Sequence, residues 1–220
     1  MEPTLRPRVK VCCISSLEEA GLAVACGASA LGFVSAMPSG PGVIGEPLIA
    51  QIARRVPPPV APFLLTCAQD ARNLIAQQRR TGCGTLQLCD YVSPEAYAEL
   101  RRALPGIRLV QVIHVTGEES VAEAVAAARH VDALLLDSGR PSLAIKELGG
   151  TGRVHDWRLS RRIRETVDVP LFLAGGLKPE NVAEAVREVG PFGLDVCTGV
   201  RSDGRLDAEK LRAFMQVAGA

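Results

Sequence analysis

The chain has 220 residues, of which 47% are hydrophobic, 22% are charged and 4% are aromatic, and its formal net charge is +1. A chain of this kind is globular, with a sizeable core built mainly from Val, Leu, Ile and Ala. Its basic pairs are scattered, so we expect no nucleic-acid partner. It has neither about eighteen consecutive apolar residues nor an apolar leader core, so we expect no membrane partner and a cytoplasmic location.

In chain order, short apolar runs rich in β-branched residues alternate with longer segments of helical period. Strands are predicted at 8–14, 29–35, 60–66, 84–89, 108–115, 131–137, 169–175 and 192–197. Helices are predicted at 17–27, 46–55, 68–81, 93–103, 118–129, 157–166, 179–188 and 207–217.

This alternation predicts a parallel sheet with right-handed crossovers, because continuously apolar strands are buried on both faces. The number of units and the length favour a single (β/α)8 TIM barrel over residues 1–220, closed by pairing of 8–14 with 192–197. A doubly wound open sheet is the competing architecture. In a barrel, the residues at the carboxyl ends of the strands form the active site.

Seven cysteines occur without any C-x-x-C pair. An ordinary zinc site or disulfide framework is therefore poorly supported, and we expect no metal and no cofactor. A metal or redox cluster of Cys12, Cys89 and Cys197 at the barrel mouth is conceivable, but these residues lack local ligand spacing.

Glycine clusters follow the sixth, seventh and eighth predicted strands, where backbone N–H groups can converge on an anion. One glycine alone would only shape a turn, whereas three clusters after consecutive strands predict a phosphate site. The predicted phosphate-binding residues are Gly150, Thr151, Gly152, Gly175, Gly176, Thr198 and Gly199.

Several longer motifs resemble the phosphoribosylanthranilate isomerase family over nearly the whole chain. They are KVCCIS (10–15), GASALGFV (27–34), Gln87-Leu88, LLLDS (134–138), GGTGRVHDW (149–157), LAGGLKPENV (173–182) and GLDVCTGV (193–200).

The resemblance implies an Amadori rearrangement of a phosphoribosylamine, with Cys12 as general base and Asp137 as general acid. The chemistry needs an acid to protonate the furanose oxygen and a base to remove the C2 proton. Taken alone, Cys12 could be a small buried residue and Asp137 a helix cap. Gln87 is a further candidate substrate ligand, and Asp195 either contacts the ribose or, as we slightly favour, pairs with Lys10 on the first strand.

Four strand-end residues depart from the family pattern. Cys13 replaces a glycine, Pro41 an arginine, Cys89 a histidine and Arg201 a glutamate. The alternation of the strand points Cys13 away from the face of Cys12, so we expect it to pack behind the sheet.

The arginine replaced by Pro41 holds the anthranilate carboxylate in the family. Arg140 and Arg201 are candidates to replace it, although both are equally expected as surface arginines. His114 has a modest chance of lining the pocket.

The leading hypothesis is a phosphoribosylanthranilate isomerase-like enzyme whose partner is a small phosphorylated sugar-amine. The alternatives are the same chemistry on a different phosphoribosylamine, suggested by Pro41, and a non-catalytic phosphate-ligand binder. The chain is expected to be a monomer or a homodimer.

Overall fold

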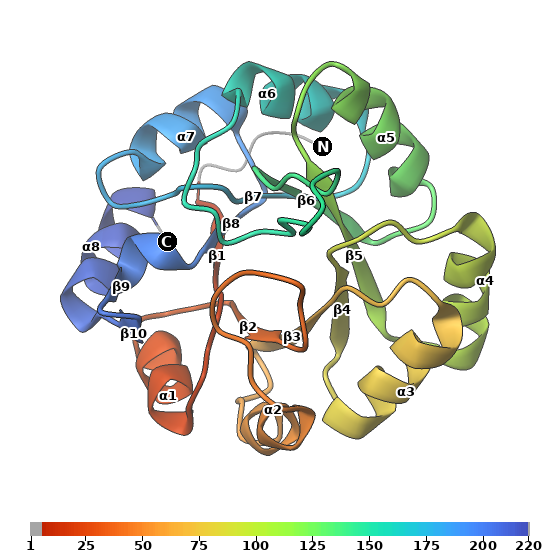
Figure 1. Ribbon diagram of the computed structural model, residues 1–220. Helices are drawn as coiled ribbons and strands as arrows, with labels where there is room; N and C mark the ends of the chain where they lie inside the picture. Colours follow the sequence, from red (N-terminus) through yellow and green to blue (C-terminus); the bar gives the residue numbers. More distant parts are fainter. Residues whose placement is uncertain (1–5, 220) are drawn as a thin grey trace.

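A computed structural model describes residues 6–219 of the chain. Eight parallel strands form a closed barrel, and the helices surround it (Figure 1). The strands are β1 (Arg8–Val11), β2 (Ala30–Val34), β3 (Ala61–Thr66), β4 (Thr85–Leu88), β5 (Arg108–His114), β6 (Ala133–Asp137), β7 (Leu171–Leu173) and β8 (Gly193–Val196). The helices are α1 (Leu17–Ala25), α2 (Glu46–Ala53), α3 (Ala71–Thr81), α4 (Pro94–Ala103), α5 (Glu119–Ala128), α6 (Trp157–Thr166), α7 (Val182–Val189) and α8 (Ala208–Ala218).

The barrel closes between its first and last strands. Val9 of β1 pairs with Leu194 of β8, and Lys10 pairs with Asp195, in parallel register. The predicted (β/α)8 barrel and its predicted closing pair are confirmed, and the open sheet is excluded. This closure brings the end of β8 next to Cys12, whose N–H donates to the carbonyl of Val196.

Side chains of each strand alternate between two separate apolar clusters. On β2, Leu31 and Phe33 face the helices, whereas Ala30 and Val34 face the barrel interior. The interior cluster also receives Phe63 and Phe172, whose rings meet edge to face with centroids 6.0 Å apart. Inward positions near the carboxyl ends of the strands are therefore the ones available to a ligand.

Many helices begin at a polar side chain placed one residue before the first turn. The Ser16 hydroxyl accepts a hydrogen bond from the Glu19 N–H, and Asp70, Ser93 and Asp207 cap α3, α4 and α8 in the same way. Such caps satisfy N–H groups that have no partner within the helix. They fix where each loop ends, and thus the length of each loop at the barrel mouth.

The structure differs from the predicted elements in two places that affect the site. The first strand ends at Val11 rather than at residue 14, because Cys13 has a positive φ of 60° that no strand continues through. After β8, a short 3-10 turn, η1 (Thr198–Val200), leads into a small hairpin of β9 (Arg201–Ser202) and β10 (Arg205–Leu206), which the sequence did not predict. Across residues 6–219, no helix is both long and apolar enough to span a bilayer.

Candidate active site

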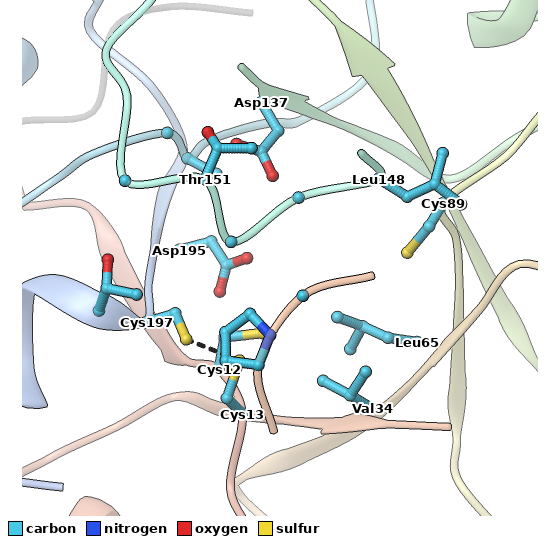
Figure 2. A pocket seen from close by; sticks show the side chains of 18 of the residues that line it. Cys12, Cys13, Val34, Leu65, Cys89, Asp137, Leu148, Thr151, Asp195 and Cys197 are labelled. Atoms are coloured by element: carbon cyan, nitrogen blue, oxygen red, sulfur yellow. Dashed lines mark hydrogen bonds between the residues drawn. The ribbon is translucent and has the colours of Figure 1, made fainter. Parts of the chain in front are cut away.

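A cavity of about 70 Å³ lies at the carboxyl ends of the strands, where the loops that follow them meet. Figure 2 shows Asp137 and Thr151 on one side of it and Cys12, Cys13 and Cys197 on the other. Its chemically reactive or polar lining residues are Cys12, Cys13, Ser39, Gln87, Cys89, Asp137, Thr151, Asp195, Cys197 and Thr198. A larger cavity, of about 670 Å³, lies at the amino ends of the strands, and none of the predicted site residues lines it.

Cys12 follows the last residue of β1 and points into the barrel. Its N–H donates to the carbonyl of Val196 at 2.8 Å, which fixes it to the end of β8. A Cβ on Gly32 would be 2.9 Å from both Cys12 Sγ and Lys10 Nζ, so glycine leaves the space that these two groups fill. A hydrogen bond with Cys13 is the main cause that lowers the pKa of the Cys12 thiol; burial and the Asp195 carboxylate oppose it, and the Lys10 charge adds to it. Cys12 is thus placed to carry a thiolate.

Asp137 is the last residue of β6 and is buried across the cavity from Cys12. Its Oδ1 accepts the N–H of Ser138 at 2.7 Å. A Cβ on Gly149 would come within 2.7 Å of Oδ2, so the glycine-rich loop approaches the carboxyl group closely only because Gly149 has no side chain. One oxygen of Asp137 is therefore held by the backbone, while the other faces the loop that borders the cavity.

The expected pair of Lys10 and Asp195 is confirmed. Lys10 is 0% exposed, and its Nζ lies 2.8 Å from Asp195 Oδ1 and 5.5 Å from the ring centroid of Phe63. Burial by itself lowers the pKa of Lys10, but the nearby Asp195 carboxylate and Cys12 outweigh it, so that the net change is upward. Lys10 thus remains a cation beneath the cavity. Asp195 forms an ion pair with it and also lines the cavity wall.

The glycine-rich turns after β6 and β7 line the cavity together with Thr198 after β8, whose hydroxyl oxygen would lie 3.8 Å from a Cβ on Gly152. Of the predicted phosphate-binding residues, the structure places all but Gly199 in the lining: Gly150, Thr151, Gly152, Gly175, Gly176 and Thr198. Among the described residues, the backbone N–H groups of Gly152, Gly175 and Gly176 donate to no other protein group. Unpartnered N–H groups that converge in this way suit an anion.

Gly176 has two reasons to be a glycine. Its φ is 63°, and a Cβ there would lie 2.8 Å from the carbonyl oxygen of Gly152. Asn181 holds the same turn, because its side-chain nitrogen donates to the Gly176 carbonyl at 3.0 Å and its oxygen accepts the Lys178 N–H at 2.9 Å. The turn after β7 is therefore packed directly against the loop after β6.

The expectation that Arg201 is a substrate ligand is corrected. Its side chain is 8% exposed, and its Nη1 lies 2.7 Å from Glu19 Oε1. Its Nη2 donates to Glu19 Oε2 at 3.1 Å and to the carbonyl of Cys13 at 2.5 Å. Burial raises the pKa of Glu19, but Arg201 and the Leu206 and Ser15 N–H groups lower it to about 2 overall. Arg201 does not line the cavity; it ties the end of β1 to the end of β8.

Two other polar candidates also lie outside the cavity lining. Arg140 is exposed and borders a separate surface depression, and its backbone pairs with Glu147. His114 is buried, with Nε2 3.0 Å from the carbonyl of Cys89, and it does not reach the cavity.

Gln87 does line the cavity, and its Oε1 is buried without a hydrogen-bond partner. An unpaired buried amide oxygen is costly unless a ligand supplies a donor.

The expectation that Cys13 packs behind the sheet is wrong. Its φ of 60° ends the alternation of β1, so that both Cys12 and Cys13 belong to the inward cluster. Cys13 Sγ lies 2.6 Å from Cys197 Sγ, and a Cβ on Gly42 would be 2.5 Å from Cys13 Cβ. Strand alternation alone carries no signal for a left-handed residue at the strand end.

Residues that the sequence analysis did not single out join three loops over the cavity. Ser39, after β2, donates to the carbonyl of Lys146, after β6, at 2.7 Å, and Lys146 Nζ lies 2.5 Å from Asp90 Oδ2, after β4. Pro41 lies against Gly150, where a Cβ would be 2.5 Å from its Cδ. These contacts hold the loops after β2, β4 and β6 together over the cavity.

Within residues 6–219, no group of three or more His, Cys, Asp and Glu side chains is arranged to hold a metal ion. The cysteine cluster considered from the sequence therefore has no support as a metal centre. Burial raises the pKa of the Cys89 thiol, which keeps this residue as a neutral, small part of the wall.

Comparisons with known proteins match the whole barrel. The family model of N-(5'-phosphoribosyl)anthranilate (PRA) isomerase matches residues 9–217. The chain belongs to the PRA isomerase family. It is 37% identical to N-(5'-phosphoribosyl)anthranilate isomerase 2 of Methanosarcina mazei, over 96% of this chain and 93% of that protein.

Solved structures of the family superpose closely on the barrel. PRA isomerase from Thermotoga maritima is 29% identical, with a TM-score of 0.82, and the match covers 96% of this chain and 98% of that one. A PRA isomerase in complex with reduced 1-(o-carboxyphenylamino)-1-deoxyribulose 5-phosphate is 27% identical, with a TM-score of 0.79 and the same coverage.

Membership of the family makes the departures at the strand ends specific features of this chain. Cys13 takes a backbone conformation that glycine adopts without strain. Arg201 is paired with Glu19 and lies outside the lining, so the cation at that position adds no charged group to the cavity wall. The lining of this PRA isomerase family member, within residues 6–219, includes two carboxylates, Asp137 and Asp195, and no Lys or Arg.

Proposed function

We propose that this chain isomerises N-(5'-phosphoribosyl)anthranilate to 1-(o-carboxyphenylamino)-1-deoxyribulose 5-phosphate, a step of tryptophan biosynthesis, with Cys12 as general base and Asp137 as general acid. The single observation that carries the assignment is that a thiol and a carboxyl group face each other across a cavity bordered by the glycine-rich turns after β6 and β7 and by Thr198 after β8. A pure phosphate binder has no need for this opposed pair.

The phosphate is held by the turns after β6, β7 and β8. The free N–H groups of Gly152, Gly175 and Gly176 supply hydrogen bonds without a cationic side chain. Thr151 and Thr198 add hydroxyl groups on the same side of the cavity. Anchoring the phosphate there leaves the ribose between Asp137 and Cys12.

The first chemical step opens the furanose ring. The Asp137 carboxyl group donates a proton to the ring oxygen, the C1–O bond breaks, and the nitrogen lone pair forms the C1=N iminium. The position of Asp137 at the end of β6, with one oxygen fixed by the Ser138 N–H, supports this role. The fixed oxygen orients the carboxyl group toward the substrate.

The second step removes the C2 proton of the iminium. The Cys12 thiolate takes the proton, the C2–H electrons form the enol-amine, and this tautomerises to the ketone. The lowered pKa of the Cys12 thiol supports the role, since the hydrogen bond with Cys13 and the Lys10 charge favour the thiolate despite burial and the nearby Asp195 carboxylate. The product is an isomer of the substrate, so no other reactant is consumed.

Kinetics with three variants test the assignment. We expect Cys12→Ala and Asp137→Asn each to lower kcat by about a hundredfold or more with little change in KM, because only proton transfer is lost. Cys26→Ala, at the outer end of α1, is the matched control and should retain full activity. The wild type, but neither site variant, should restore growth of a tryptophan auxotroph that lacks this isomerase. Full activity in Cys12→Ala would refute the assignment.

One observation favours a second candidate, the same rearrangement on a phosphoribosylamine whose N-substituent carries no carboxylate. In the described residues no Lys or Arg lines the cavity, and Pro41 lies against Gly150. Loss of a charge-assisted clamp on a carboxylate costs on the order of 2–4 kcal/mol.

Comparing kcat/KM for phosphoribosylanthranilate and for phosphoribosylaniline separates the two candidates. If the carboxylate is part of the natural substrate, the anthranilate compound is the better substrate and Pro41→Arg adds little. If it is not, the aniline compound is preferred, and Pro41→Arg raises kcat/KM for the anthranilate compound by about tenfold, or about 1.4 kcal/mol.

A further inference from the structure

Two thiols that the proposed reaction does not use meet at the mouth of the barrel. Cys13 follows β1 and Cys197 follows β8, which are hydrogen-bonded neighbours. Their sulfur atoms are 2.6 Å apart, about half an ångström longer than the S–S bond of about 2.05 Å (Figure 2). Both are free thiols, and both line the cavity.

The backbone holds this pair together. Cys13 keeps a positive φ of 60°, which a residue other than glycine rarely adopts, and this conformation turns its side chain toward Cys197. The Cys13 carbonyl oxygen accepts a hydrogen bond from Arg201 Nη2 at 2.5 Å. The approach of the two sulfurs therefore needs no rearrangement of either strand.

We propose that Cys13 and Cys197 are a thiol modification site that two-electron oxidants of the peroxide class convert to a reversible disulfide, which shuts down the adjacent active site.

The half-buried Cys197, which precedes the exposed Thr198, is the point of attack. Its thiolate attacks one oxygen of hydrogen peroxide: an S–O bond forms, the O–O bond breaks, and the departing hydroxide takes up a proton to give water. The sulfur of Cys13 then attacks the sulfenic sulfur of Cys197: the S–S bond forms, the S–O bond breaks, and the departing hydroxide takes the Cys13 proton as a second water. Two thiols are oxidised, and one peroxide is reduced.

Oxidation changes the site in two ways. In the reduced protein the neighbouring Cys13 thiol lowers the pKa of Cys12 and so favours its thiolate, and a disulfide removes that thiol proton. The new bond also fixes Cys197 to the end of β1, next to Thr198 on the phosphate side of the cavity. The loss of activity rests on the proposed function, whereas formation of the disulfide does not.

The test treats the full-length protein with one equivalent of hydrogen peroxide, quenches it under denaturing conditions with a maleimide and maps its peptides by mass spectrometry. We expect the wild type to lose two of its seven free thiols and to give one Cys13–Cys197 cross-linked peptide that dithiothreitol removes. Cys67→Ser is the matched control, because Cys67 is a half-buried thiol after β3 outside the cavity, and it should behave as the wild type does.

Cys197→Ala and Cys13→Gly should give no cross-linked peptide. Cys13→Gly guards against a failure of the first variant to fold, since glycine accepts the positive φ. Isomerase activity of the wild type and of Cys67→Ser should fall at least tenfold on oxidation and return with dithiothreitol, while each pair variant should keep its own reduced activity.

A Cys12–Cys13 disulfide, or oxidation confined to Cys12, would overturn the proposed pair. A Cys13–Cys197 disulfide that leaves turnover unchanged would overturn its effect on the site. A reduced wild type with no isomerase turnover would instead overturn the proposed function, and peptide mapping would still decide whether the pair forms.

Discussion

Replacing Arg201 by methionine removes the cation of a buried network while keeping much of the volume of the side chain. Arg201 holds Glu19 through both carboxylate oxygens, at 2.7 and 3.1 Å, with the side chains 8% and 13% exposed. A pKa of Glu19 lowered from 4.5 to about 2 corresponds to at most about 3.4 kcal/mol, at about 1.36 kcal/mol per pKa unit. Allowing for solvent screening of a partly exposed carboxylate, we expect Arg201→Met to lower the free energy of unfolding by about 2–3 kcal/mol.

Urea unfolding of the wild type and of Arg201→Met, followed by circular dichroism from neutral to acidic pH, tests this value. The pKa of Glu19 is lower in the folded protein than in the unfolded chain. Its contribution to the free energy of unfolding is therefore complete above pH 4.5 and is lost as the pH falls toward about 2. The difference in free energy of unfolding between the two proteins should therefore be largest near neutral pH and should become smaller as the pH falls from 4.5 toward about 2.

Arg158→Met is the matched control. Arg158 pairs with Asp156 on the surface, with a side chain that is 85% exposed, and its loss should leave the free energy of unfolding close to that of the wild type. The reasoning is refuted if Arg201→Met unfolds at the wild-type urea concentration while KM for phosphoribosylanthranilate rises sharply. That result would make Arg201 a substrate ligand after all.

Three further predictions concern the cavity. The kcat/KM of the wild type should be lost as the pH falls through a midpoint below 9.0, the ordinary value for a thiol, because the pKa of Cys12 is lowered and its thiolate is the base; a midpoint at or above 9.0 contradicts this. Lys10→Met should move that midpoint upward and should lower the free energy of unfolding in urea by about 3–5 kcal/mol, because it leaves the buried Asp195 without a partner. Adding Asp195→Asn should recover part of this stability. Stability losses of the two substitutions that simply add would contradict the ion pair. Gly176→Val should weaken the binding of inorganic phosphate in calorimetry by at least about tenfold, because its Cβ meets Gly152 and Arg153, whereas Gly106→Ala, with open space around it, should bind phosphate normally; equal affinities would remove the turn after β7 from the phosphate site.

Much of the barrel could be read from the sequence because its signals are local and repeated. The period of two along each strand points Lys10, Cys12, Asp137 and Asp195 inward, and closure by the first and last strands brings Lys10 beside Asp195. The glycine clusters after β6 and β7 follow consecutive strands, so the fold alone brings both to the cavity.

The tertiary structure decided what depends on one backbone angle or on partners far away in the chain. The φ of Cys13 turns its thiol toward Cys197, and no pattern of residue types reports a single left-handed angle. Arg201 looked free in the sequence because its partner, Glu19, lies 182 residues away. The bond from Ser39 to Lys146, which closes the cavity, spans 107 residues. Such contacts form only once closure of the barrel has brought the loops together, so local sequence propensities do not predict them.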